Sequence, residues 1–311
     1  MLEKGFRITE IARTIDKHKS VVSREIKRNC DLRSGQYKSD LAQRKYQARM
    51  SDKPKKIRFT REIKDNVEEL IRQDYSPEQV VGFLKKSGQQ TVSEERIYQH
   101  IWADKKRKGK LHEHLRRKGR RYRKRGASKD SRGIIKGRIG IENRPETVNQ
   151  RSRFGDLEID LVIGANHKGA LLTINDRASG VLKMGKVESK NAEEICRVAC
   201  ELLRDWKPYI KTITADNGKE FARHQKISET LSIDFFFANP YHSWERGSNE
   251  NLNGLIRQYF PKKMDFNSIT DEQIKEVETK LNSRPRKRFK FETPMFVMKK
   301  LLFNIKVAFV A

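Results

Sequence analysis

The segment Gly155-Asp156-Leu157-Glu158-Ile159-Asp160-Leu161-Val162-Ile163 alternates between apolar and acidic side chains. A period of two is typical of a β-strand, in which successive side chains point to opposite faces. One face therefore carries the apolar residues, and Asp156, Glu158 and Asp160 share the other. The segment predicts a strand that presents a row of carboxylates.

Four further strand-like runs follow, at residues 170–175, 181–187, 210–215 and 233–238. A long helix is predicted between the third and fourth strands, because apolar residues recur there on one helical face. They are Ala192, Ile195, Cys196, Ala199, Leu202, Leu203 and Trp206. Three strands, a helix, a strand, a helix and a strand predict an α/β domain with a mixed five-stranded sheet and flanking helices.

The front of the chain has a helical period instead. Apolar residues at positions 8, 11, 12 and 15 follow the spacing of one helical face, and a polar turn separates them from a second helix over residues 20–28. Two short helices around a tight turn predict a helix-turn-helix, with an ordinary basic helical hairpin as the alternative. The second helix turns candidate DNA-binding residues outward: Ser20, Ser23, Arg24, Lys27 and Arg28.

A second unit of this kind is predicted after a basic spacer. Ser76-Pro77-Glu78-Gln79 is a strong helix start, since serine caps and proline suits the first helical position. Ser87-Gly88 predicts the end of that helix, and Ser93-Glu94 opens another. Two such units in tandem favour DNA as the partner.

The charge distribution agrees with a polyanionic partner. The 311 residues contain 69 Lys and Arg against 41 Asp and Glu, a formal net charge of +28, and the length predicts two or three domains. Residues 1–150 hold 41 basic and 20 acidic side chains, whereas residues 151–250 hold 15 of each. This asymmetry is typical of a nucleic-acid-binding region joined to a neutral domain.

Residues 105–125 concentrate that charge, with thirteen Lys and Arg against Glu113. We interpret the run as a tether without a packed core that neutralises DNA phosphates; a merely solvated linker is the alternative. Its candidate DNA contacts are Arg116, Arg117, Lys118, Arg120 and Arg121.

Membrane and export functions are not predicted. The start of the chain has no apolar signal region, and the apolar stretch near the end is shorter than the ~20 residues of a membrane span. Three cysteines at positions 30, 196 and 200 are interpreted as reduced apolar fillers. We expect a cytoplasmic, nucleoid-associated protein.

Three acids stand where structure can present them. Asp160 is on the first strand, Asp216 ends the strand-like run Ile210–Ala215, and Glu250 is on a predicted helix. That helix packs through Leu252, Leu255, Ile256 and Tyr259, and position 250 lies about 200° from Leu252 at ~100° per residue, away from the apolar stripe. Carboxylates gathered in this way suit hard cations, which take oxygen ligands.

The sequence segments around these acids resemble those of a known family. Thr214-Ala215-Asp216-Asn217-Gly218-Lys219-Glu220-Phe221 and Trp244-Glu245-Arg246-Gly247-Ser248-Asn249-Glu250-Asn251-Leu252-Asn253-Gly254 are similar to motifs of the DDE transposases of bacterial insertion sequences. The gap of 33 residues between Asp216 and Glu250, and the segment Leu281-Asn282-Ser283-Arg284-Pro285-Arg286-Lys287, narrow the resemblance to the insertion-sequence-thirty family. The resemblance covers essentially the whole chain.

The resemblance implies an RNase H-like catalytic domain, with an integrase-type core, that uses two divalent ions, Mg²⁺ or Mn²⁺. Asp160, Asp216 and Glu250 are then both the catalytic residues and the metal ligands, and Arg246 and Arg257 are candidate phosphate contacts. The expected activity is cleavage and strand transfer at the terminal inverted repeats of an insertion sequence. The expected partners are those repeats, target DNA and further copies of the chain.

The expected organisation has four parts. A helix-turn-helix unit occupies residues 1–50, a second one residues 51–103, a basic linker residues 104–150 and the catalytic domain residues 151–311. Only seven residues precede Ile8, so the first unit is expected to lack a helix that precedes it in the family. Two alternatives stay open: an inactive or truncated DNA-binding protein or repressor of the element ends, and an RNase H-type nuclease without strand transfer.

Overall fold

The computed structural model describes residues 1–52, 58–118, 135–239 and 247–308. Its contacts divide the chain into two units, Met1–Arg58 and Phe59–Ala311.

The first unit consists of three helices, α1 (Ile8–Thr14), α2 (Lys19–Asn29) and α3 (Ser39–Asp52). Its core is small, with Ile11, Ala12 and Val22 buried between α1 and α2. His18 caps α2, because its Nδ1 accepts a hydrogen bond from the Ser20 amide at 3.3 Å. The helical pair expected over residues 8–28 is therefore present, and the imidazole takes the role that a serine side chain usually has.

The second unit begins with three more helices, α4 (Arg61–Arg72), α5 (Pro77–Lys86) and α6 (Glu94–Lys106). Ser76 and Ser93 cap α5 and α6 as expected. Helix α4 was not predicted, although Thr60 caps it and Ile63, Val67, Leu70 and Ile71 follow a helical period.

The prediction of an unpacked tether over residues 105–125 is wrong for its first part. Leu111 and Leu115 are buried in the core formed by α4, α5 and α6, and residues Leu111–His114 form a short 3-10 helix. Two leucines spaced four apart are enough to anchor a basic segment, because long cationic side chains can stay in solvent while the apolar ones pack. Residues 119–125 lie outside the described ranges.

The rest of the second unit is built on a mixed sheet. The strands are β1 (Ile139–Gly140), β2 (Asp156–Ile163), β3 (Ala170–Asp176), β4 (Leu182–Val187), β5 (Thr212–Ala215) and β6 (Asp234–Phe237). Their order is β1-β6-β5-β2-β3-β4. Strands β2, β3 and β4 form an antiparallel meander, and β5 and β6 continue the sheet in parallel to β2. This topology confirms the RNase H-like fold class.

The strand count differs from the expected five. Strand β1 lies within the segment expected to be a linker, and it pairs Ile139 with Phe236 and Gly140 with Phe237. Ile135 and Val148 on either side are buried, and α7 (Glu146–Gln150) follows. The linker assignment is therefore wrong for residues 135–150. A strand of two residues is too short to show an alternating pattern in the sequence.

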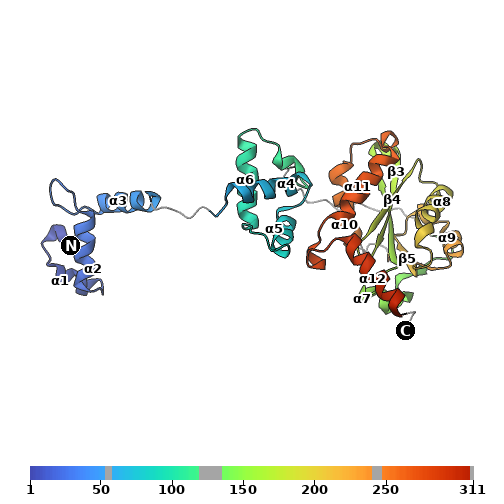
Figure 1. Cartoon of the computed structure of the whole chain (residues 1–311), viewed down its shortest axis with the longest axis horizontal. Coiled ribbons are helices and arrows are strands. Elements are labelled where there is room, and N and C mark those ends of the chain that lie inside the picture. Colours follow the sequence, from blue (N-terminus) through green and yellow to red (C-terminus); the bar gives the residue numbers. More distant parts are fainter. Residues whose placement is uncertain (53–57, 119–134, 240–246, 309–311) are drawn as a thin grey trace. The chain divides into compact units, whose positions relative to one another are not determined.

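Helices cover both faces of this sheet (Figure 1). Helices α8 (Ala192–Leu203) and α9 (His224–Leu231) pack on the face of Leu157, Ile159 and Leu161. Helices α10 (Gly247–Tyr259) and α11 (Asp271–Ser283) pack on the other face, and α12 (Pro294–Ala308) follows α11. On the acidic face of β2, Asp156 and Glu158 are thus buried, and Asp160 is half-buried.

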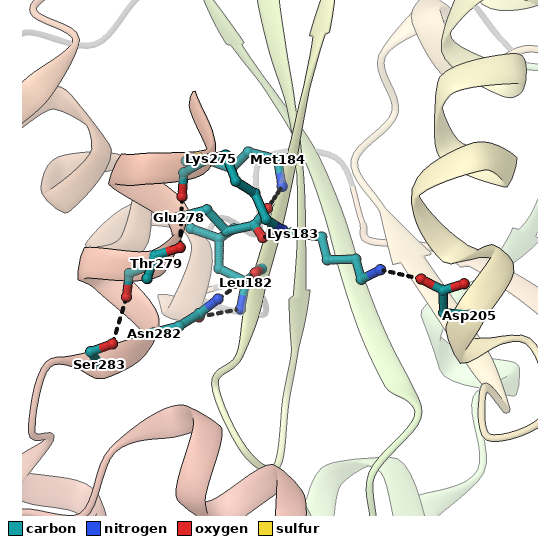
Figure 2. Close-up of polar contacts among 9 residues, drawn as sticks. All are labelled: Leu182, Lys183, Met184, Asp205, Lys275, Glu278, Thr279, Asn282 and Ser283. Atoms are coloured by element: carbon teal, nitrogen blue, oxygen red, sulfur yellow. Dashed lines mark hydrogen bonds and ion pairs between the residues drawn. The ribbon is translucent and has the colours of Figure 1, made fainter. Parts of the chain in front are cut away.

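The edge strand β4 is closed by side chains of α11 (Figure 2). Asn282 accepts from the Leu182 amide and donates to the Leu182 carbonyl, both at 2.8 Å, and Glu278 accepts from the Met184 amide at 2.7 Å. An exposed strand edge invites pairing with other chains, so these bonds give the edge its missing partners.

No helix in the described ranges is long and apolar enough to span a membrane.

Candidate active site

Asp160 and Asp216 lie at the same level of two neighbouring strands. Parallel strands β2 and β5 pair Asp156 with Thr212 and Glu158 with Thr214. Continued by two residues, this register sets Asp160 beside Asp216, which directly follows β5, at the ~4.8 Å spacing of adjacent strands. Both side chains are half-buried.

The other two acids of β2 are engaged in ion pairs. Asp156 is fully buried and accepts from Arg153 at 2.8 and 3.0 Å. Glu158 is 1% exposed and pairs with the buried Arg177. These pairs compensate the cost of burying the charge of each carboxylate, and both acids therefore have a structural role in the interior. Among these three acids, Asp160 is the one that is partly open to solvent.

Helix α10 reaches Asp160 through Asn253. The Nδ2 of Asn253 donates to Oδ2 of Asp160 at 2.6 Å. Position 250 precedes position 253 by three residues and so lies on the same side of the helix, one turn earlier. The side chain of Glu250 lies outside the part of the chain that the structure describes, and the structure gives its place on α10 alone.

The turn after β5 holds Asp216 in place. Oδ1 of Asp216 accepts from the Gly218 amide at 3.0 Å. The neighbouring Asn217 is buried, donates to the Ala238 carbonyl at 2.5 Å and accepts from Arg138. A turn fixed from both sides keeps the Asp216 carboxylate at the end of its strand.

A fourth acid is close to this pair. Glu220 is half-buried in the 3-10 helix Lys219–Phe221. Burial raises the pKa of Glu220, and the negative charges of Asp216 and Asp160 raise it further. The three carboxylates are therefore near enough to repel one another, and a cation placed among them would relieve that repulsion.

The donor set suits a hard divalent cation. Carboxylate and amide oxygens are the ligands that Mg²⁺ and Mn²⁺ take, and Oδ1 of Asn253 is buried without a hydrogen-bond partner among the described residues. No ready group of three acidic, histidine or cysteine ligands stands together within the described ranges, from which the Glu250 side chain is missing.

The expected DNA contacts lie in several places. Ser23, Arg24, Lys27 and Arg28 are exposed on α2, and Ser20 is half-buried at its start. Arg117 and Lys118 are exposed, whereas Arg120, Arg121 and Arg246 lie outside the described residues. Arg116 donates to Oδ1 and the carbonyl of Asn251, at 2.8 and 3.1 Å. Arg257 donates to the Ile163 carbonyl at 2.6 Å, which favours a structural role for it at the end of β2.

Several known proteins similar to this chain are transposases. A transposase for insertion sequence element IS4351 from Bacteroides fragilis is 52% identical over 309 residues, which cover 99% of this chain and 95% of the relative. Transposase InsI for insertion sequence element IS30A from Escherichia coli (strain K12) is 31% identical over 314 residues, covering 96% of this chain and 80% of the relative. The chain belongs to the insertion-sequence-thirty (IS30) family of transposases.

No protein-family model matches the sequence of this transposase. The solved catalytic core domain of BIV integrase is similar to 49% of the transposase chain and to 97% of its own, with a TM-score of 0.39 and 16% identity.

Sequence reasoning missed two residues of the candidate site. Asn253 follows Glu250 by three positions, the spacing that puts two residues on one helical face, and this signal was available. Glu220 follows Asp216 by four positions in an irregular turn, and its approach to Asp160 depends on the pairing of β2 with β5. No sequence period reports that pairing.

Proposed function

We propose that this transposase is a DDE-type polynucleotidyl transferase in which Asp160, Asp216 and Glu250 hold two divalent ions, Mg²⁺ or Mn²⁺. The observation that carries the proposal is the parallel register of β2 with β5, which leads to Asp160 on one strand and to Asp216 after the other. The hydrogen bond from Asn253 joins Asp160 to the helix of Glu250. Bound there, two such ions supply activation of the attacking oxygen and stabilisation of the leaving oxygen.

The chemistry needs no covalent protein intermediate. Water attacks a phosphodiester at an element end, its oxygen bonds to phosphorus, and the bond to the 3′ oxygen breaks. The freed 3′-hydroxyl then attacks a target phosphodiester, so that one P–O bond forms as another breaks. Asn253 keeps the Asp160 carboxylate in one orientation during both steps, and the turn at Asn217 does the same for Asp216.

The helical units serve DNA binding in this proposal. Exposed Ser23, Arg24, Lys27 and Arg28 on α2 suit contacts with the terminal inverted repeats. The basic residues 105–125 suit contacts with phosphates, and target DNA is the second nucleic-acid partner. Because two element ends must be joined to one target, we also propose that the protein acts as an oligomer in the nucleoid.

A comparison of neighbouring acids tests the assignment. Asp160→Asn and Asp216→Asn should lose cleavage and joining of element-end DNA while keeping the melting temperature and DNA affinity of the wild type. Asp156→Asn is the matched control on the same strand, and it should lower the melting temperature but keep cleavage below that temperature, since Asp156 is engaged with Arg153. Cleavage by Asp160→Asn, together with a folded but inactive Asp156→Asn, would transfer the catalytic role to Asp156.

A further inference from the structure

A cavity of about 360 Å³ lies within the second unit, between the helices α4 to α6 and the sheet domain. One wall comes from α10, through Asn251, Leu252, Leu255 and Gln258. The segment after α11 forms another wall, and the helical side contributes Ser76, Glu78, Gln79 and Arg116. The cavity is therefore beside the helix that carries Glu250.

Cationic side chains dominate the lining. It contains five of them, Arg116, Arg284, Arg286, Lys287 and Arg288, against two acids, Asp74 and Glu78. Asp74 accepts from the Tyr259 hydroxyl and bonds with His114, each at 2.9 Å. Glu78 pairs with Lys287 of the same lining at 2.5 Å, so the four arginines carry the positive charge that remains.

Three of the arginines lack a carboxylate partner in the part of the chain that the structure describes. Arg116 donates to Asn251, Arg284 donates to the Gln258 amide oxygen and the Tyr259 hydroxyl, and Arg286 donates to the Leu281 carbonyl. Arg284 is only 3% exposed, and its Nε is buried without a hydrogen-bond partner among the described residues. A buried donor and charge such as that of Arg284 requires an acceptor, whereas Arg286 is half-buried and Arg116 is exposed to solvent.

The positive charges of the neighbouring arginines destabilise one another, and the pKa values of these arginines are lowered. Burial lowers the pKa of Arg286 to about 10, and the charges of Arg284 and Arg288 add to the effect. Desolvation also lowers the pKa of Arg116, with further contributions from Arg117 and Arg284. An anion in the cavity would reverse this repulsion.

Two glycines leave room for the cluster. A Cβ at Gly254 on α10 would overlap the Arg116 guanidinium, and a Cβ at Gly180 would overlap that of Arg288. Any other residue at position 254 would force Arg116 away from α10.

We propose that this cavity binds a phosphodiester of the DNA backbone through Arg116, Arg284 and Arg286. The inference rests on DNA as the partner in the proposed function and adds a specific phosphate site to it. Guanidinium groups bind phosphate oxygens through paired, charge-assisted hydrogen bonds, and they do so best where water is excluded. A phosphate held there fixes the DNA against α10 and ties the second set of helices to the catalytic domain.

The test couples one protein charge to one DNA charge. Duplexes of the element end, each with a single neutral methylphosphonate, are bound to the wild type and to Arg286→Gln in EDTA, so that no cleavage is needed. At one position or two adjacent ones, the methylphosphonate should weaken binding by the wild type about tenfold. The same change should weaken binding by Arg286→Gln less than about twofold.

Matched variants guard the result. Arg116 belongs to no buried apolar core, so Arg116→Gln should fold even if Arg286→Gln does not. In Arg116→Gln, too, the methylphosphonate should weaken binding less than about twofold. Arg197→Gln removes an exposed arginine from α8, on the far face of the sheet. In this control the methylphosphonate should still weaken DNA binding about tenfold, as in the wild type.

Two outcomes would overturn the proposal. The methylphosphonate could weaken binding by Arg286→Gln and by Arg116→Gln as much as binding by the wild type, at every DNA position. That result would exclude a DNA phosphate from the cavity. The same result, with inorganic phosphate raising the melting temperature of the wild type but not of Arg286→Gln, would assign the cavity to a free anion instead. Coupling in a protein that never cleaves DNA would uphold the phosphate site and contradict only the proposed catalysis.

Discussion

Asn253 on α10 donates a hydrogen bond of 2.6 Å to Oδ2 of Asp160 on β2, and this contact joins the first proposed carboxylate to the helix of the third. Chain segments 93 residues apart are thereby fixed against each other at the proposed centre of the chemistry. An amide that orients a carboxylate also limits which oxygen that carboxylate can offer to a cation.

Removal of this amide should weaken catalysis more than stability. Asn253→Ala should lower the rate of DNA cleavage by about 10- to 100-fold and raise the Mg²⁺ concentration needed for half-maximal rate, because Asp160 loses its fixed orientation. Asn253→Asp should be worse, since an isosteric carboxylate repels Asp160 instead of donating to it. Cleavage rates at graded Mg²⁺ and Mn²⁺ measure both effects.

The exposed Asn143 provides the control, and Asn143→Ala should match the wild type. Asn253→Ala with an unchanged metal dependence and a lowered melting temperature would mean that Asn253 serves packing alone.

The closing of the β4 edge predicts a stability effect. Asn282→Ala should lower the free energy of unfolding by about 1–3 kcal/mol, because the amide and carbonyl of Leu182 lose their partner in a buried place. Ser283→Ala, next to it but exposed, should stay within about 0.5 kcal/mol of the wild type. Urea unfolding compares the two; equal effects would show that Asn282 does not protect the edge.

The buried Asp176 predicts a pH dependence. Burial raises its pKa from 3.8 to about 6, although Ser179 and the Gly155 amide donate hydrogen bonds to it. Between these two values the folded protein keeps a proton that the unfolded chain has released, so the Asp176 contribution to stability falls as pH rises. The fall amounts to about 3 kcal/mol and is complete above pH 6.

The variant Asp176→Asn isolates this contribution. The free energy of unfolding of the wild type minus that of Asp176→Asn should decrease from pH 4 to pH 6 and level off above. A difference that is flat over this range, or that rises with pH, would show that Asp176 is charged in the folded protein throughout.

Much of the sheet domain could be predicted from the sequence, because its strands alternate or are continuously apolar. Five strands appear at the expected places, and both α8 and α10 follow the apolar stripes that predicted them. Strand β1 was missed because two residues carry no period, and Leu111 and Leu115 were missed because basic neighbours conceal a pair of buried leucines.

The site was predicted less completely than the fold. Strand and helix patterns gave positions for Asp160, Asp216 and Glu250, but Asp156 and Glu158 share a strand face with Asp160, so that only three-dimensional partners separate them. Arg153 and Arg177 are those partners, and Arg177 is 19 residues from Glu158 in the chain. Which acid is engaged in an ion pair is a property of tertiary packing and is not encoded in a local pattern.

The most direct test of the central claim is cleavage and joining of labelled DNA that bears the element ends, by the purified transposase with Mg²⁺ and with EDTA, beside Glu250→Gln. The account predicts nicked and joined products from the wild type with Mg²⁺ only, and none from Glu250→Gln, although both proteins bind the ends. Specific binding without cleavage by the wild type, or metal-dependent products from Glu250→Gln, would contradict it.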